Sequence, residues 1–249
     1  MTTLVERLKA RFFADGELDA DVRATYLALR RAIGLVVFFT PIVLVGWGLA
    51  CGIAWSSMAA LSDFYWLSPT GDGFAPCRDW LVGSLVAVGM GLIIYRGYSA
   101  LECWLLNFAG LALIVDALNP TSWPPLYHDQ WHIHEIASVT FFLMIALTVW
   151  FCGPDTLLDD LDPKTRTRWL WKYSMLASAM AIAPLAAWLL ARKNERTLWA
   201  EVTGVWVFSA YWFVKTYELA RVSNIEPVSG PAPRLRRVAG KIQIVRPAG

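Results

Sequence analysis

The chain has few charged residues and little of the chemistry expected of a soluble enzyme. Only 17% of its 249 residues are charged, against about a quarter in an average soluble domain. The formal net charge is +2, which gives no electrostatic reason to expect nucleic acid as a partner. The four cysteines have no C-x-x-C spacing and indicate no metal or redox motif, although a disulfide between Cys51 and Cys77 remains open.

Signatures of known catalytic sites are also missing. The chain contains no G-x-S-x-G nucleophile turn, no glycine-rich phosphate loop and no H-E-x-x-H pair. No span carries a continuous polar stripe of the kind that a solute channel needs. The sequence motifs therefore point to no particular reaction.

What the chain has instead is apolar sequence. Hydrophobic residues make up 57% of it, and mean hydropathy is +0.45. Apolar runs close to the ~20 residues that cross a bilayer recur along the chain, and inside a bilayer they can only be helices. We therefore predict an all-α, polytopic membrane protein built as a bundle of six transmembrane helices, over Ile33–Trp55, Asp79–Tyr95, Leu101–Leu118, Ile133–Phe151, Leu170–Leu190 and Trp199–Leu219.

The distribution of Lys and Arg predicts the orientation. Basic residues gather before the first span and after the last, and none occurs in 53–77 or 119–131. By the positive-inside rule both termini are cytoplasmic, in a multi-pass protein of the inner membrane. Three basic residues between the fifth and sixth spans are an exception, namely Arg192, Lys193 and Arg196. The predicted parts are a cytoplasmic amphipathic segment (1–32), the membrane domain (33–220) and a basic, Pro-containing cytoplasmic tail (221–249).

Polar side chains collect at the external ends of the predicted spans. Five helix ends or loops contribute them to one face, and together they can line an external pocket. These residues are Asp63, Asp72, Arg78, Asp79, Asp116, Asn119, His128, Asp129, His132, His134, Glu135 and Glu201.

All three histidines of the chain lie in one stretch of that face. His128 and His132 are four residues apart and share a helix face if the helix begins before Tyr127, whereas His134 points elsewhere. A zinc site on His128 and His132 would therefore need a carboxylate ligand, and no cofactor is predicted otherwise. The alternatives are histidines that cap the fourth span, and a metal-free polar site for a lipid head group.

Three other polar positions lie within or beside the spans. Ser138 follows His134 by one turn and is expected to bond its own backbone or to pack against a neighbour. Lys215 lies toward the cytoplasmic end of the last span, where its stem can snorkel, with an ion pair to Glu218 at i+3. Small residues repeat every fourth position at Gly83, Ala87 and Gly91, which favours close helix packing.

Three segments resemble a known group of proteins. They are R-D-W-L-V-G-S-L-V-A-V-G-M-G-L-I-I-Y-R-G-Y-S from Arg78, N-F-A-G-L-A-L-I-V-D-A-L-N-P-T from Asn107 and H-E-I-A-S-V-T-F-F-L from His134. They are similar to bacterial six-helix membrane proteins of domain-of-unknown-function group 998. The layout more distantly resembles the FRAG/DRAM/Sfk family, which includes a factor for lipid remodelling of GPI anchors.

The resemblance implies roles for several positions. It implies an Arg at the start of the second span (Arg78), a turn after the third (Asn119–Thr121) and a His that opens the fourth (His134). Glu201 resembles an acidic position of the distant family, whose histidine in that span is replaced by an aromatic residue near Tyr211 or Trp212.

The leading functional hypothesis is a lipid-associated protein of the bacterial envelope. In it Arg78 binds an anionic head group, and Asp79, Asp116, His134 and Glu201 complete the polar lining. A second hypothesis is a metal-dependent membrane hydrolase that uses the histidine cluster, and a third is an accessory or structural subunit of a larger membrane complex. The expected partners are membrane lipids, with protein partners in the membrane under the third hypothesis.

Overall fold

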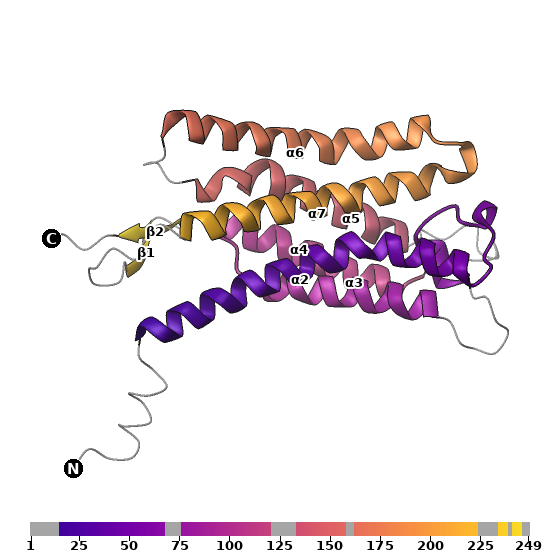
Figure 1. The fold of residues 1–249 in the computed structure, drawn as a ribbon, viewed down its shortest axis with the longest axis horizontal. Helices are drawn as coiled ribbons and strands as arrows, with labels where there is room; N and C mark the ends of the chain where they lie inside the picture. The colour runs from indigo at the N-terminus through magenta and orange to yellow at the C-terminus, as the bar shows by residue number, and fades with distance from the viewer. Residues whose placement is uncertain are drawn as a thin grey trace, which may run out of the picture.

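The described part of the chain forms a bundle of six long helices that lie side by side (Figure 1). The computed structural model describes residues 15–67, 76–120, 133–157, 162–223, 234–238 and 241–245, with side chains described within 24–67, 76–120, 133–157 and 162–220. The helices alternate in direction along the chain. We call one end of the bundle the termini end, because the first helix begins there and the last helix ends there. The other end is the far end.

The number of helices in the described residues agrees with the six that the sequence predicted, but their ends differ from the predicted ones. They are α2 (Asp15–Ala50), α3 (Pro76–Ile94), α4 (Ala100–Leu118), α5 (Ile133–Leu147), α6 (Pro163–Leu190) and α7 (Arg196–Ser223). The first helix begins 18 residues before the predicted Ile33, because the charged stretch before it continues the same helix. Short turns complete the helical part: η1 (Trp55–Ser57), η2 (Ser62–Tyr65), the π-helix η3 (Thr148–Cys152), η4 (Gly153–Thr156) and η5 (Lys193–Glu195).

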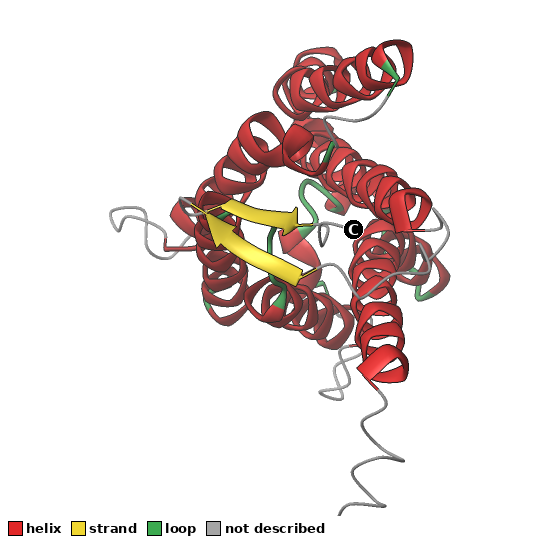
Figure 2. Ribbon diagram, turned by 90° about the vertical axis from the view of Figure 1, so that its left-hand side faces the viewer, coloured by secondary structure: helices red, strands yellow, loops and turns green. Residues whose placement is uncertain are grey.

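The tail adds the one departure from an all-α chain within the described residues. Strands β1 (Arg234–Val238) and β2 (Lys241–Val245) form an antiparallel hairpin, with Arg234 opposite Val245. In the end-on view of Figure 2 this hairpin is drawn at the termini end of the bundle. The sequence predicted a basic tail there but no strands.

The outside of the bundle has the apolar surface of a membrane protein. Five helices are long and apolar enough to cross a bilayer: α2 (over Ala24–Ala50), α3, α4, α5 with its extension to Thr156, and α6. Large apolar side chains on the outside are exposed, among them Trp104 (63%), Val139 (67%) and Leu190 (87%). In water such a surface would be costly, but it suits contact with lipid. α7 belongs to the same bundle but is not among the five, because Trp, Tyr, Thr and charged side chains lower its hydropathy.

Local sequence explains where two of the helices begin. Ser99 caps α4 by accepting a hydrogen bond from the backbone N–H of Glu102 (3.1 Å), and the Glu102 carboxylate accepts one from the N–H of Tyr98 (2.6 Å). This is close to the S-x-x-E capping box. Asp162 caps α6 through the N–H of Thr165 (3.1 Å), with Pro163 at the first helical position.

Helices α3 and α4 make the closest approach in the bundle. A Cβ at Gly110 would lie 2.5 Å from the carbonyl oxygen of Gly89, and a Cβ at Gly89 would lie 2.8 Å from that of Gly110. Only glycine at both positions allows the two backbones to come this close. The predicted stripe was therefore partly misplaced, because a Cβ at Gly83 meets nothing within 4 Å, whereas one at Gly91 would meet Ile33 at 2.9 Å.

Three further features complete the fold: the position of α6, the loop that follows α2, and the state of the cysteines. Helix α6 lies at the outside and packs mainly on α7 (Figure 1). The loop between α2 and α3 folds over the far end, where Met58 and Phe64 are buried. All four cysteines are free, so the disulfide left open between Cys51 and Cys77 is not formed.

Replacing Gly110 with Ala should destabilise the protein by about 1–3 kcal/mol, because the new methyl group presses on the backbone of α3. Gly83→Ala is the matched control: it lies on the same helix pair, has open space, and should be neutral or slightly stabilising by helix propensity. Thermal unfolding of the two variants in one detergent measures the difference. Equal melting temperatures would show that the α3–α4 contact is not as tight as described.

Candidate functional site

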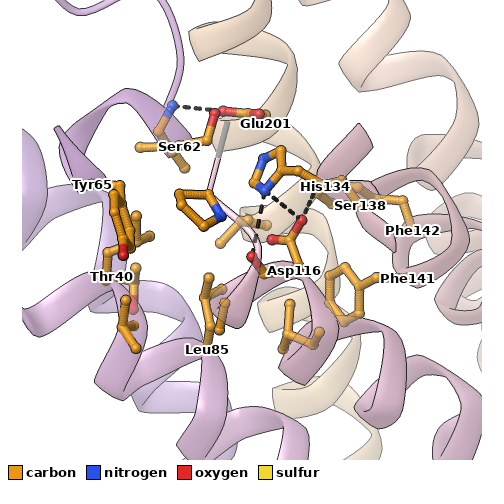
Figure 3. Close-up of a pocket in the computed structure, with 17 residues that line it drawn as sticks. Thr40, Ser62, Tyr65, Leu85, Asp116, His134, Ser138, Phe141, Phe142 and Glu201 are labelled. Atoms are coloured by element: carbon orange, nitrogen blue, oxygen red, sulfur yellow. Dashed lines mark hydrogen bonds and ion pairs between the residues drawn. The ribbon is translucent and has the colours of Figure 1, made fainter. Parts of the chain in front are cut away.

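The far end of the bundle contains a cavity of about 80 Å³. A water molecule needs roughly 10–15 Å³ by the same kind of measure, so several waters or part of a larger molecule fit. Five helices and the loop after α2 line it, as Figure 3 shows. The lining contains three of the five residues that the sequence proposed for a ligand site: Asp116, His134 and Glu201.

One wall of the cavity is a polar group formed where α4 ends and α5 begins. The Asp116 carboxylate oxygen Oδ1 lies 3.1 Å from Nδ1 of His134 and accepts the hydroxyl proton of Ser138 at 2.5 Å. The Asp116 and His134 side chains are both buried, at 8% and 10% exposure. Because Asp116 faces the start of α5, the positive end of that helix dipole also stabilises its charge.

The surroundings of His134 define which ring nitrogen carries a proton. Besides Asp116 Oδ1, Nδ1 lies 3.0 Å from the carbonyl oxygen of Asn119 and 3.4 Å from that of Asp116. All three neighbours are acceptors, so Nδ1 must be the N–H donor. In the neutral ring Nε2 then keeps a lone pair, as it does in carboxylate–histidine pairs that bind a ligand or metal.

The same contacts give His134 a structural role. The last carbonyl groups of an α-helix have no partner within the helix, and Nδ1 of His134 lies within hydrogen-bond distance of the carbonyl of Asn119, the C-cap residue of α4 (3.0 Å). The sequence predicted histidines that cap the fourth span, whereas His134 contacts the end of the third, α4. This contact uses Nδ1 alone, so it does not exclude a ligand at Nε2.

Glu201 joins α7 to the loop that covers the cavity. Its Oε2 accepts the backbone N–H of Leu61 at 2.6 Å, and nearby the N–H of Leu198 donates to the carbonyl of Ala59 at 2.8 Å. In Figure 3 the ring of His134 is drawn between Glu201 and Asp116. Glu201 therefore holds the loop over the cavity and brings a second carboxylate to its lining.

Asp63 organises the same loop from within. Its Oδ2 accepts the N–H groups of Ala59 (3.0 Å) and Ala60 (2.8 Å). Burial raises the pKa of the Asp63 carboxyl, while these two N–H groups and the nearby His134 oppose the rise. The effect of His134 on Asp63 indicates that the loop carboxylate and the imidazole are close enough to interact.

Much of the cavity lining is apolar. It is formed by aliphatic and aromatic side chains from α3, α4, α5 and α7, namely Leu85, Leu113, Phe141, Phe142 and Val205. The cavity is therefore lined mainly by apolar side chains with a few polar groups among them, which is the usual composition of a small-molecule site.

Two residues of the proposed site lie elsewhere. Arg78 and Asp79 are not part of the cavity lining, and their side chains are 41% and 65% exposed. Nε of Arg78 lies 3.4 Å from Oδ1 of Asp79, so the guanidinium pairs with its neighbour in the sequence. The sequence placed them correctly at the far end but could not show which way they face.

The metal hypothesis rests mostly on residues outside the described part of the chain. His128, His132 and Asp72 fall in segments 68–75 and 121–132, which are not described. Among the described residues, no group of three or more His, Cys, Asp or Glu is placed to hold a metal ion. A zinc site on His128 and His132 stays a prediction.

Sequence reasoning missed part of the site. Ser138 was expected to bond its own backbone, but its hydroxyl reaches across to Asp116 on another helix. Its i+4 spacing from His134 was the available signal, since the two side chains share a helix face. Thr40, Ser62 and Tyr65 also line the cavity, and no local pattern marked them.

Comparisons of the chain with protein-family models, curated proteins and solved structures found no match. The resemblance to group 998 and to the FRAG/DRAM/Sfk family therefore stays an expectation. The geometry of the cavity and its lining is the basis of the function proposed for the protein.

Replacing Glu201 with Ala should release the loop after α2, because the buried N–H of Leu61 loses its acceptor at a cost of about 1–3 kcal/mol. Hydrogen exchange of the amides around Leu61 should speed up, and the melting temperature should fall. Glu201→Gln keeps an acceptor oxygen and should retain most of the protection, and Asp79→Ala on the exposed surface should have no effect. Unchanged exchange in Glu201→Ala would contradict the assigned contact.

Proposed function

We propose that the protein is a multi-pass protein of the bacterial inner membrane that binds a lipid head group in the far-end cavity. All six helices cross the membrane, both termini are cytoplasmic and the cavity faces outward. Five apolar helices, an apolar outer surface and the loop pattern of Lys and Arg support this orientation.

The observation that carries the proposal is the mixed polar and apolar lining of a cavity at the helix ends. Asp116, His134 and Ser138 form the polar part, and Phe141 and Phe142 lie among the apolar side chains. Helix ends lie at the depth where the head groups of a bilayer meet its acyl chains. An amphipathic molecule there places its polar part against the carboxylate–imidazole pair and its apolar part against the phenyl rings.

The charges of the lining define the head group. Asp116 and Glu201 are acidic, and the cavity contains no Lys or Arg among the described residues that line it. Nε2 of a neutral His134 accepts a hydrogen bond and does not donate one. The site therefore suits a head group that donates, through an amine or a hydroxyl, better than it suits a bare phosphate.

This conclusion changes the sequence-based hypothesis in one respect. Arg78 was proposed to bind an anionic head group, but its side chain lies outside the cavity and pairs with Asp79. Lipid binding is kept as the proposed function, and the recognising group becomes the Asp116–His134 pair.

Lipid binding to the purified full-length protein tests the proposal, with native mass spectrometry as the readout. Phosphatidylethanolamine and phosphatidylglycerol carry donors on their head groups, whereas phosphatidylcholine has a trimethylated amine and none. Phosphatidylcholine should bind about tenfold more weakly, the loss expected from one hydrogen bond to a charged group. Asp116→Asn and His134→Phe should remove the preference, and Arg78→Ala should keep it.

The opposite pattern would contradict the proposal. If Arg78→Ala abolishes binding while Asp116→Asn and His134→Phe leave it intact, the head group is anionic and lies on the surface. Equal binding of all three lipids to every variant would indicate a non-specific annular contact.

Cysteine labelling tests the orientation separately. In a variant without native cysteines, Ser57→Cys at the far end should react with a membrane-impermeant maleimide in intact cells. Arg96→Cys at the termini end should react only after the cells are opened, and both positions are exposed. The reverse labelling pattern would place the termini outside.

A further inference from the structure

A second group of polar side chains is buried at the termini end, on the opposite side of the apolar core from the cavity. Its members come from α2, α4, α7 and the turn before α4, and each is 0–1% exposed. We call them the termini-end cluster: Arg30, Tyr95, Glu102, Tyr211, Trp212, Lys215 and Glu218. Ionisable side chains buried inside a membrane bundle are costly and mark functional positions by default.

Arg30 forms the first part of this cluster. Its Nε donates to the Thr216 hydroxyl at 3.1 Å, and its Nη1 donates to the hydroxyl of Tyr95. The guanidinium carbon lies 4.3 Å from the centroid of the Trp212 ring and 4.9 Å from that of Tyr95. Two aromatic faces thus stabilise the charge, but the second terminal nitrogen, Nη2, has no partner.

Lys215 and Glu218 form the second part. Lys215 Nζ donates to the carbonyl of Gly153 (2.6 Å) and to the hydroxyl of Thr156 (2.5 Å), and it lies 3.5 Å from Glu218 Oε2. Tyr173 donates its hydroxyl proton to the same carboxylate. The predicted ion pair is confirmed, but the predicted snorkelling is wrong, because Lys215 is fully buried and points at the turn after α5.

Four polar atoms of the cluster have no hydrogen-bond partner among the described residues. They are Nη2 of Arg30, Oε1 of Glu102, the hydroxyl of Tyr211 and Nε1 of Trp212. Their side chains are neighbours: Arg30 lies over the Trp212 ring, and Tyr211 interacts electrostatically with both Arg30 and Glu102. Buried polar groups without partners are rare, and several in one place call for an unseen partner.

The four atoms are complementary to a water molecule. Arg30 Nη2 and Trp212 Nε1 can only donate, a carboxylate oxygen such as Glu102 Oε1 accepts, and the Tyr211 hydroxyl can do either. Water accepts two hydrogen bonds and donates two, so it satisfies donors and acceptors together. We propose that ordered water binds between these four side chains and joins Arg30 and Glu102 as a water-bridged ion pair.

The charges of the cluster disfavour an ion in the same place. An anion would meet the carboxylate of Glu102, which already interacts with Arg30 and Lys215. A cation would meet the guanidinium of Arg30. A neutral molecule that both donates and accepts avoids either repulsion, and water is the smallest such molecule.

Water in this position would lie beside the part of the cluster formed by Lys215 and Glu218. The ring of Tyr211 meets that of Tyr173 edge to face, with centroids 6.3 Å apart, and Tyr173 donates its hydroxyl proton to Glu218. Chains of carboxylates, hydroxyls and water are the paths along which protons move inside membrane proteins. The cluster thus gives the termini end a hydrated polar site that is independent of the proposed lipid site.

Tyr211→Phe provides the sharpest test, because it removes only the hydroxyl group. If water fills the site, the hydroxyl is hydrogen-bonded and its loss should lower the melting temperature by about 2–4 °C. If the site is dry, the hydroxyl is an unpaired buried group and its removal should leave the melting temperature unchanged or raise it. Tyr173→Phe, which breaks a direct bond to Glu218, is the matched control and should lower the melting temperature in either case.

Two further measurements decide the nature of the bridge. Glu102→Gln combined with Tyr211→Phe should cost less than the sum of the single variants, because both change the hydrogen bonds of the same water. A density map of the full-length protein at a resolution that resolves water should show a peak within about 2.7–3.2 Å of the unpartnered atoms. An unchanged or raised melting temperature for Tyr211→Phe, strict additivity, an empty site, or density of an ion would each overturn the proposal.

Discussion

A hydrocarbon layer offers no hydrogen bonds to the protein. Each polar group buried in the bundle therefore needs a partner from the protein or from a molecule bound to it. The bundle meets this demand with contacts between helices. His134 contacts the carbonyl of Asn119 at the end of α4, Glu201 accepts a loop N–H, and Lys215 satisfies the turn after α5. These bonds fix the helix ends, and they place polar side chains at both ends of an otherwise apolar core.

The two polar regions have different physical characters. The far-end cavity has acidic and apolar lining residues and space for a molecule, and the contacts of His134 with the described residues use Nδ1 and not Nε2. The termini-end cluster is closely packed by aromatic rings and has unpartnered atoms. Phe141 and Phe208 pack edge to face in the core between them, with ring centroids 5.8 Å apart. The far-end cavity therefore suits an amphipathic ligand, whereas the termini-end cluster suits internal water.

The sequence predicted the six helices because an apolar run of about 20 residues has few other structures in a membrane. It also predicted that Asp116, His134 and Glu201 share one face, because helix ends on the same side of the membrane converge. It could not show that Arg78 turns away, since the direction of a side chain at a helix end depends on packing. Arg30 and Glu102 were missed for a related reason: Arg30 precedes the predicted first span and Glu102 is near the start of the third, and only the tertiary fold shows that both are buried.

The central claim is that the Asp116–His134 pair faces a ligand with a hydrogen-bond donor. A density map of the full-length protein in nanodiscs of native lipid tests it most directly. We expect density in the cavity, with a donor atom about 2.7–3.2 Å from Nε2 of His134 and with apolar density against Phe141 and Phe142. An empty cavity, or an acyl chain alone against the imidazole, would contradict it.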